Sequence, residues 1–502
     1  MILGDPTTDI STTTMDAIFR RTLERRPEAV ALADPPNRED FTDGPPRRLT
    51  YAEADRVISA IASRLRGLGL QTDAVIGIQI PNTVECVLTI LGVLRAGMIA
   101  APLPLLWRRF DAARALGRIG AKAIVTVART GDCETAALAV EVGADVFTIR
   151  HVCSFGRNLP DGVIAFDDLL DASVQPQPIE IDRSGNAAAN VALVTFDVTP
   201  DGLVPTARNH AQLIAGGLAA LLEGGIAPDT HLLACCGVGS FAGLALTVVP
   251  WLLSGGTLLL HHGFEPDAFT AQYLEYGCEN VVVPGPLLPD LANAGLLAHA
   301  DLRNVLAVWR APERQTTSAA WHSAGVSVTD MLVFGEIALI GSRRGGDGLP
   351  ASLPVQAIVA PRNSAHALPV ADIARTPHGT LALRGPMVPR HAFPPGAERE
   401  DAPHLKVDGE GFVDTGYACR FDAANGTMAL SGPPPGIISV GGYRFVLSEL
   451  DSLVRRADSG AFVTALPDAV AGHRLAGVSN DIRAVLAEMG VNPLVADAFR
   501  AA

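Results

Sequence analysis

The chain of 502 residues is too long for a single hydrophobic core, so two or more domains are expected. Its formal net charge of −14 argues against nucleic acid or an anionic membrane surface as the main partner. The seven cysteines contain no CxxC pair, and the N-terminal residues lack the basic and apolar pattern of a secretory signal, so a reduced, cytoplasmic chain is expected.

The first half of the chain alternates between helical and strand-like segments. Residues 15–33 have the spacing of an amphipathic helix, and residues 49–70 repeat apolar side chains at helical intervals. Residues 84–103 predict a helix that leads into a strand. Short apolar runs predict buried strands at residues 74–80, 121–127, 146–149, 232–235 and 280–283. This alternation predicts an α/β fold of mixed, mostly parallel sheets wrapped by helices.

The segment "NVALVTFDVTPDGLVPTARNHAQL", residues 190–213, has the layout of a phosphate-binding loop. An apolar run at Val191–Val194 predicts a buried strand, a turn-forming stretch follows, and His210 opens a predicted helix. However, the segment contains one glycine, no lysine and two aspartates. It is therefore a poor match for a loop that must hold phosphate.

Residues 241–260 are apolar and long enough to span a bilayer, but Pro250 and the pair Gly255–Gly256 divide them. A buried helix, a turn and a buried strand are therefore expected here, and no membrane span.

The character of the chain changes near residue 382, where short strands joined by turns are expected, with a hairpin turn at Asn425–Gly426. Three prolines between Gly432 and Gly436 fit neither a helix nor an inner strand. We place a domain boundary there, with a large domain at residues 1–431, a hinge at 432–436 and a small, shortened α+β domain at 437–502.

Several motifs resemble the adenylate-forming superfamily of acyl-CoA synthetases, peptide-synthetase adenylation domains and luciferases. "LTYAEADRVISAIASRLRGLGL" and "VIGIQIPNTVECVLTILGVLRAGMIAAPL" are similar to the N-terminal pattern of this family, and "DGEGFVDTG" and "ISVGGYRFVLSELDSLV" to its later motifs. The resemblance covers nearly the whole chain in the same order. It implies activation of a carboxylate by ATP, followed by transfer of the acyl group to a thiol.

The phosphate loop of the family, "TSGTTGxPKG", corresponds to "TFDVTPDGLV" in this chain. Thr195 and Thr199 are retained. Asp197 and Pro200 replace glycines whose backbone N–H groups reach phosphate oxygens, and Leu203 replaces the lysine. These changes oppose phosphate binding.

The adenine loop and the metal-binding motif of the family are also altered. The family's "GGAP" becomes "WRAP", which keeps Ala311 and Pro312 but introduces Trp309 and Arg310. Either Trp309 fills the adenine space, or both new side chains point to solvent. The family's "YGxTE" becomes "FGEIA". Phe334, Gly335 and Glu336 are the remnant of this motif, with Phe334 in place of the tyrosine, and Ala338 replaces the glutamate. Glu336 lies two residues before the expected Mg²⁺ ligand and could replace it only after a backbone shift.

Three further positions implied by the resemblance are changed. Tyr417 stands where the family has an aspartate that accepts hydrogen bonds from the ribose, and Pro433 stands where it has the hinge arginine. No lysine follows Lys406, so the family's C-terminal catalytic lysine has no counterpart. We therefore assign no catalytic residue.

The segment that resembles the family's acyl pocket is better preserved. The residues in question are Ser240, Phe241, Gly243 and Pro284, and Ser240 stands where the family has a histidine. They could form a pocket for an acyl chain or an aromatic carboxylate, or they could simply be core. His261 and His262 are adjacent on a predicted strand and face opposite ways, so no metal site is expected.

Three interpretations follow. The favoured one is a degenerate, cytoplasmic member of the family that has lost its ATP site and binds an acyl ligand, CoA, a carrier protein or another protein partner. The second is an active ligase that uses ATP and Mg²⁺ through a rebuilt nucleotide site. The third is ATP-independent acyl chemistry on the same fold.

Overall fold

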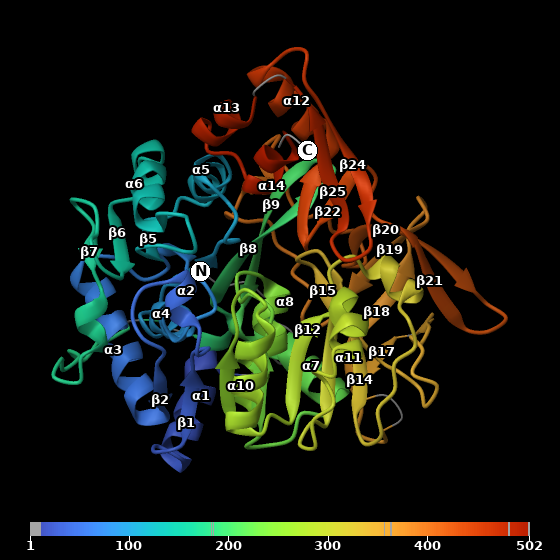
Figure 1. Ribbon diagram of the computed structural model, residues 1–502, viewed down its shortest axis with the longest axis horizontal. Coiled ribbons are helices and arrows are strands. Elements are labelled where there is room, and N and C mark those ends of the chain that lie inside the picture. The colour runs from blue at the N-terminus through green and yellow to red at the C-terminus, as the bar shows by residue number, and fades with distance from the viewer. Residues whose placement is uncertain are drawn as a thin grey trace.

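The computed structural model describes residues 12–499, apart from 182, 184, 356, 362–363 and 480–481. In this part of the chain, a large N-terminal domain holds three β-sheets and a smaller C-terminal domain holds a fourth (Figure 1). The predicted α/β fold with mixed sheets and two unequal domains is confirmed.

The first sheet has seven strands in the order β7–β6–β5–β3–β4–β8–β9, and only its last pair is antiparallel. Its strands are β3 (Val75–Gln79), β4 (Ile99–Pro102), β5 (Ala123–Val127), β6 (His151–Phe155), β7 (Ile164–Ala165), β8 (Val191–Thr199) and β9 (Gly202–Asn209).

The second sheet has eight strands in the order β15–β14–β13–β12–β10–β11–β1–β2, parallel except at its two edge pairs. Its strands are β1 (Val30–Ala33), β2 (Arg48–Thr50), β10 (His231–Ala234), β11 (Thr257–Leu260), β12 (Asn280–Pro284), β13 (Asn304–Trp309), β14 (Ser327–Phe334) and β15 (Ala338–Arg343).

The α-helices of the large domain are α1 (Met15–Arg25), α2 (Arg38–Phe41), α3 (Tyr51–Gly67), α4 (Val84–Arg95), α5 (Arg109–Arg118), α6 (Thr135–Asp145), α7 (His210–Gly224), α8 (Phe241–Gly243), α9 (Val249–Ser254), α10 (Pro266–Tyr276) and α11 (Leu288–Asn293). Side-chain capping marks the start of two of the longest. Thr50 and Glu53 form a reciprocal capping box on α3, and Asn209 and Gln212 form another on α7. Helix α4 is buried along its whole length within the largest hydrophobic core, to which both large sheets contribute.

A third, antiparallel sheet completes the large domain in the order β16–β21–β20–β19–β18–β17. Its strands are β16 (Leu353–Pro354), β17 (Ile358–Ala360), β18 (Leu368–Arg375), β19 (Thr380–Arg384), β20 (Val413–Asp422) and β21 (Thr427–Gly432). The Asn425–Gly426 pair lies in the turn between β20 and β21, as predicted.

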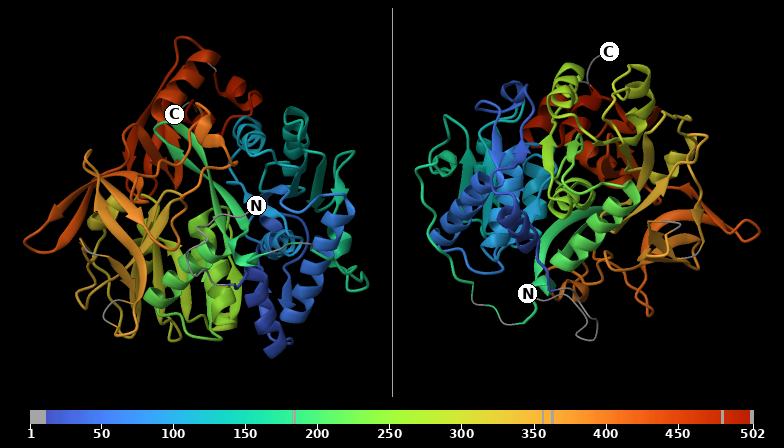
Figure 2. Two further views of the ribbon diagram at one scale, coloured as in Figure 1. Left: turned by 180° about the vertical axis from the view of Figure 1, so that it is seen from behind. Right: turned by 90° about the horizontal axis from the view of Figure 1, so that it is seen from below.

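The small domain lies across one end of the two large sheets, and the β8–β9 hairpin reaches up beside it (Figures 1 and 2). Its sheet has the order β23–β22–β25–β24, and helices pack on one another beside it. Its elements are β22 (Ile437–Val440), β23 (Tyr443–Val446), α12 (Leu447–Ala457), β24 (Phe462–Asp468), β25 (Gly472–Val478), α13 (Ile482–Glu488) and α14 (Pro493–Ala496). The boundary at residues 432–436 stays a prediction.

Two predicted elements were wrong. The helix expected over residues 15–33 ends at Arg25, because Pro27 cannot continue it, and the chain then enters β1. Residues 146–149 are not a strand: Val146 ends α6, and the following turn leads into β6.

The predicted strand at Val191–Val194 and the helix at His210 are confirmed, but the turn between them is much shorter than expected. Strand β8 continues to Thr199, only Pro200 and Asp201 form the turn, and β9 starts at Gly202. The segment is thus a long β-hairpin with a two-residue turn.

The helix, turn and strand predicted for residues 241–260 are confirmed. Helices α8 and α9 join through a π-helical turn (Leu244–Val248), Gly255 adopts the left-handed conformation with φ of 70°, and β11 follows. Across the described residues, none of the helices combines the length and apolar character that crossing a bilayer requires.

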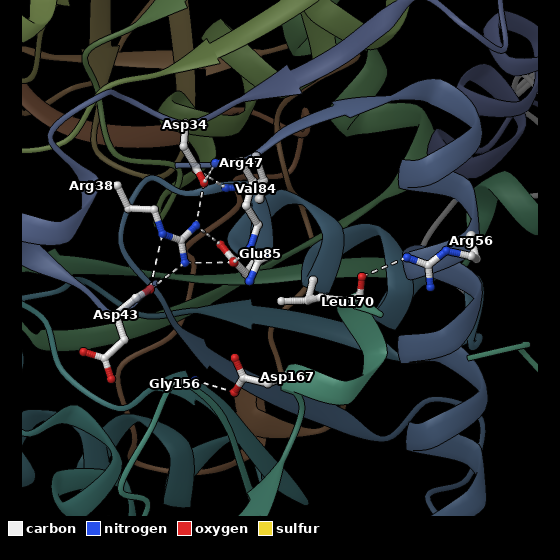
Figure 3. Close-up of polar contacts among 10 residues, drawn as sticks. All are labelled: Asp34, Arg38, Asp43, Arg47, Arg56, Val84, Glu85, Gly156, Asp167 and Leu170. Atoms are coloured by element: carbon white, nitrogen blue, oxygen red, sulfur yellow. Dashed lines mark hydrogen bonds and ion pairs between the residues drawn. The ribbon is translucent and has the colours of Figure 1, made fainter. Parts of the chain in front are cut away.

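A buried ionic network ties the segment after β1 to the start of α4 (Figure 3). Arg38 donates to both carboxylate oxygens of Glu85, at 2.8 and 2.9 Å, and also pairs with Asp34. Asp34 in turn accepts the backbone N–H of Val84 at 2.8 Å. Burial, together with the charge of Glu85, raises the pKa of Asp34.

Candidate functional site

A cavity of about 690 Å³ lies between the large sheets and the small domain. Its walls come from the β8–β9 hairpin, the loops after β4 and β10, the end of β14 and the β22–β23 hairpin. One part of its wall is apolar, formed by Ile80, Leu103, Trp107, Phe196, Leu203, Val238 and Val333. A cavity of this size that combines apolar and polar side chains is typical of a small-molecule site.

The residues that resemble the phosphate loop lie in the β8–β9 hairpin. Thr199 stabilises the turn, because its Oγ1 donates to the carbonyl of Gly202 at 3.1 Å. Thr195 is buried, and its Oγ1 has no hydrogen-bond partner among the described residues. Leu203 and Asp197 line the cavity, whereas Pro200 lies in the exposed turn. The hairpin therefore presents a leucine and a carboxylate where the resemblance implies phosphate binding.

Asp197 is held by an arginine from the small domain. Its Oδ1 lies 2.7 Å from Nη1 of Arg444, on β23, and its Oδ2 accepts the backbone N–H of Glu336 at 3.1 Å. The other Nη of Arg444 lies 2.5 Å from the hydroxyl of Tyr417. Burial raises the pKa of Tyr417 to about 12, so this phenol is neutral at physiological pH. Burial alone would lower the pKa of Arg444, but Tyr417 and Asp197 raise it overall.

Two of these three residues, Asp197 and Tyr417, stand at positions where the resemblance implies other residues. Sequence reasoning missed the third, Arg444. The available signal was its place in "ISVGGYRF", two residues after the Gly441–Gly442 turn that points the hairpin into the cavity.

The carboxylate of Glu336 accepts a hydrogen bond at the start of helix α8. Glu336 follows Gly335 in the tight β14–β15 turn, and its Oε2 accepts the backbone N–H of Phe241 at 2.7 Å. Burial raises the pKa of Glu336, although the charge of Arg310 opposes this shift. Phe334 packs edge-on against Tyr417 with ring centroids 5.5 Å apart, and Ala338 pairs with Phe334 across the strands.

Trp309 and Arg310 point to different surroundings. The indole of Trp309 is 4% exposed, and its Nε1 donates to Asp330 Oδ1 at 2.8 Å. It fills the space beside Gly285, where an added Cβ would lie 2.4 Å from the ring. Trp309 therefore does not point to solvent, and it is absent from the described cavity wall.

Arg310 does line the cavity. Its guanidinium donates to the Oγ of Ser240 at 2.6 Å, and the described ion pairs within 4.0 Å include none for this residue. Ala311 and Pro312 continue into a short 3-10 helix (Pro312–Thr317). A half-buried guanidinium with one neutral partner is well placed to bind an anion.

The four candidate acyl-pocket residues separate into one that lines the cavity and three that pack. Ser240 lines the cavity and caps α8 by accepting the N–H of Gly243. Phe241 is fully buried beneath Arg208, whose Cζ lies 3.6 Å from the ring centroid. Gly243 is needed for close packing, since an added Cβ would lie 2.0 Å from the carbonyl of Gly237. Pro284 ends β12 outside the described cavity wall.

Pro433 lies exposed in the linker between β21 and β22. Within the described residues, no group of three or more His, Cys, Asp or Glu side chains has a metal-binding arrangement.

Comparisons with known proteins agree with this architecture. The model of the family "AMP-binding enzyme" matches residues 19–352. The chain is 29% identical to a 2-hydroxy-7-methoxy-5-methyl-1-naphthoate–CoA ligase of Streptomyces carzinostaticus over 248 residues, which are 48% of this chain and 43% of the ligase. It is 28% identical to long-chain fatty acid transport protein 1 of Homo sapiens over 55% of this chain and 41% of that protein. These alignments thus span less than half of each of the two curated relatives.

Among solved structures, the amide bond synthetase McbA from Marinactinospora thermotolerans superposes with a TM-score of 0.70 and 20% identity, covering 95% of this chain and 94% of that one. This likeness concerns the fold alone.

Proposed function

Since the chain belongs to the AMP-binding enzyme family, we propose that this acyl-CoA synthetase-like protein binds an acyl or aromatic carboxylate without consuming ATP. One observation carries the proposal: the charged groups on the cavity wall are placed in a way that suits a carboxylate and not a nucleotide. The relative with a naphthoate in its name supports an aromatic acid as one candidate ligand.

On the side that resembles the phosphate and metal site, the cavity presents the carboxylates of Asp197 and Glu336. The nearby cation, Arg444, is already bound to Asp197 and Tyr417. A triphosphate placed here would approach two carboxylates, and Arg310, the arginine outside this network, already acts on Glu336 with its charge. Electrostatic stabilisation of the phosphates, on which adenylate chemistry depends, would be weak.

On the side that resembles the adenine loop, Arg310 brings a positive charge to the cavity wall. A carboxylate ligand can bind this guanidinium through charge-assisted hydrogen bonds while its hydrocarbon part packs against Trp107, Phe196 and similar side chains. CoA, a carrier protein or another protein is the proposed partner of the bound acyl ligand.

The test is calorimetry on the purified protein with Mg-ATP and, separately, with benzoate, a naphthoate and a medium-chain fatty acid. We expect no heat from Mg-ATP up to millimolar concentration and binding by at least one acid. Arg310→Met should weaken that binding by about tenfold to a hundredfold. Arg420→Met, at an exposed arginine outside the cavity wall, is the matched control and should leave the affinity unchanged.

Formation of acyl-adenylate from ATP and any of these acids, at a rate above buffer, would reject the proposal. It would favour the alternative of an active carboxylate-activating ligase with a rebuilt nucleotide site, binding ATP and Mg²⁺.

A further inference from the structure

The small domain reaches into the cavity through the β22–β23 hairpin. The turn at Gly441–Gly442 lies against Arg310, where a Cβ on Gly442 would be 2.9 Å from the arginine Cδ. The next residue, Tyr443, accepts the backbone N–H of Leu106 on its hydroxyl at 3.1 Å. Both the turn and Tyr443 therefore contact the large domain, and Arg444 is the next residue in the chain.

Of the two described ion pairs between the domains, the one made by Arg444 is the more buried. The side chain of Arg444 is 12% exposed and that of Asp197 is 3% exposed, so both charges are shielded from solvent. Tyr417 supplies a second partner from β20. An ion pair this buried is costly to break, because removing either partner leaves a charge without compensation.

The other described side-chain ion pair between the domains is exposed to solvent. Arg114 on α5 and Glu449 on α12 are 3.0 Å apart, but their side chains are 44% and 46% exposed. Such a pair contributes little, because water and salt screen it. Arg114–Glu449 therefore provides a matched comparison for Asp197–Arg444.

The two partners of Arg444 belong to the two segments that the nucleotide would occupy in the family pattern. Asp197 stands in place of a loop glycine and Tyr417 in place of the ribose aspartate. One arginine from the small domain contacts both. Asp197 and Tyr417 thus act together. Both bind Arg444 at positions where the family pattern has residues that bind the nucleotide.

We propose that Asp197, Arg444 and Tyr417 form an interdomain latch that keeps the small domain docked in the absence of nucleotide. The β22–β23 hairpin is then a fixed wall of the cavity. The latch does not depend on which ligand the cavity binds, so it can be tested separately from the proposed function.

Hydrogen exchange measured by mass spectrometry tests the latch on the full chain. Two backbone N–H groups of the large domain report docking directly, because Leu106 donates to Tyr443 and Phe110 donates to the carbonyl of Gly490 at 2.9 Å. In Arg444→Gln, exchange at these two amides should be faster by more than about tenfold. In the control Arg114→Gln, it should change by less than about threefold.

Further variants separate undocking from unfolding. Peptides from α12, whose Leu450, Leu453 and Val454 form the core of the small domain, should stay protected in Arg444→Gln. If they do not, Tyr417→Phe, which removes only a hydroxyl, should still accelerate the two reporter amides. Asp197→Asn combined with Arg444→Gln should add little to either single change, because the residues act as one pair.

The latch is overturned if neither Arg444→Gln nor Tyr417→Phe accelerates the reporter amides beyond the control. It is also overturned if Mg-ATP slows their exchange in the unmodified protein, because docking would then depend on nucleotide. Unchanged exchange on addition of Mg-ATP supports it.

Discussion

The carboxylate of Glu336 caps the helix that begins at Phe241, with its Oε2 atom 2.7 Å from the backbone nitrogen. The backbone N–H of the same glutamate donates to Asp197 at 3.1 Å. One residue in the β14–β15 turn thereby connects the start of α8 to strand β8. Glu336 is 7% exposed, so this connection is made away from water.

Removing this cap should destabilise the protein. Glu336→Ala leaves the N–H of Phe241 without an acceptor in a buried place, which should lower the free energy of unfolding by about 1–3 kcal/mol. Glu336→Gln keeps an acceptor oxygen and should lose clearly less. Urea denaturation of both variants measures the difference, and equal losses would show that the hydrogen bond is not the cause.

Trp309 should be a packing residue that the fold needs. Trp309→Gly, which restores the family pattern, removes a buried indole and should lower the free energy of unfolding by about 3–5 kcal/mol. Trp309→Phe keeps most of the volume but loses the bond to Asp330, at a cost of about 1–2 kcal/mol. Gly285→Ala should be harmful when the indole is present and better tolerated when it is combined with Trp309→Gly, and additive effects in denaturation would contradict this contact.

The helices were predictable where local signals agree with burial. In α3 the apolar spacing and the Thr50–Glu53 capping box mark the same start, and Gly255 marks the end of α9. Strand β9 was missed because "GLVPTARN" contains Pro205. It forms because β9 is the last strand of its sheet, where a missing N–H can be tolerated.

The site was predictable only as a set of changed positions. No strand was predicted at Trp309, and Arg310 lies just beyond the end of β13, so no local pattern says which of the two faces the cavity. That choice depends on Gly285 and Asp330, which are contacts with other strands. The pairing of Asp197 with Arg444 joins segments 247 residues apart, and no local pattern indicates it.

The buried network around Arg38 should be sensitive to loss of its cation. Arg38→Met leaves Asp34 and Glu85, both 0% exposed, facing each other with less compensation, and should cost about 3–5 kcal/mol of stability. Arg20→Met, which removes an exposed partner of Asp16, should cost less than about 1 kcal/mol. Similar losses in urea denaturation would contradict the difference in burial.

Acid should destabilise the protein partly through His210. Burial lowers its pKa to about 4, and its Nδ1 accepts the backbone N–H of Met15, which requires the neutral ring. Because the unfolded chain takes up this proton near pH 6.5, the unfolded state binds more protons between about pH 6.5 and 4, and stability falls as the pH falls through that window.

His210 should account for roughly 3 kcal/mol of this loss. His210→Gln should therefore flatten the dependence of unfolding free energy on pH across the window, although His262, whose pKa is also lowered to about 4 by burial, still contributes. His378→Gln, at an exposed histidine, is the control. An unchanged slope in His210→Gln would contradict the assignment.

Restoring two family residues should not restore nucleotide binding. Leu203→Lys with Tyr417→Asp returns the lysine and the ribose acid, but Asp197 still faces the cavity and Arg444 would gain a second carboxylate partner. We expect this double variant to show no Mg-ATP binding tighter than about 1 mM in calorimetry. Adding Asp197→Gly removes the repelling carboxylate and with it one residue of the latch. The triple variant should bind Mg-ATP in the measurable range. Micromolar binding by the double variant alone would show that Asp197 and Arg444 do not keep the nucleotide out.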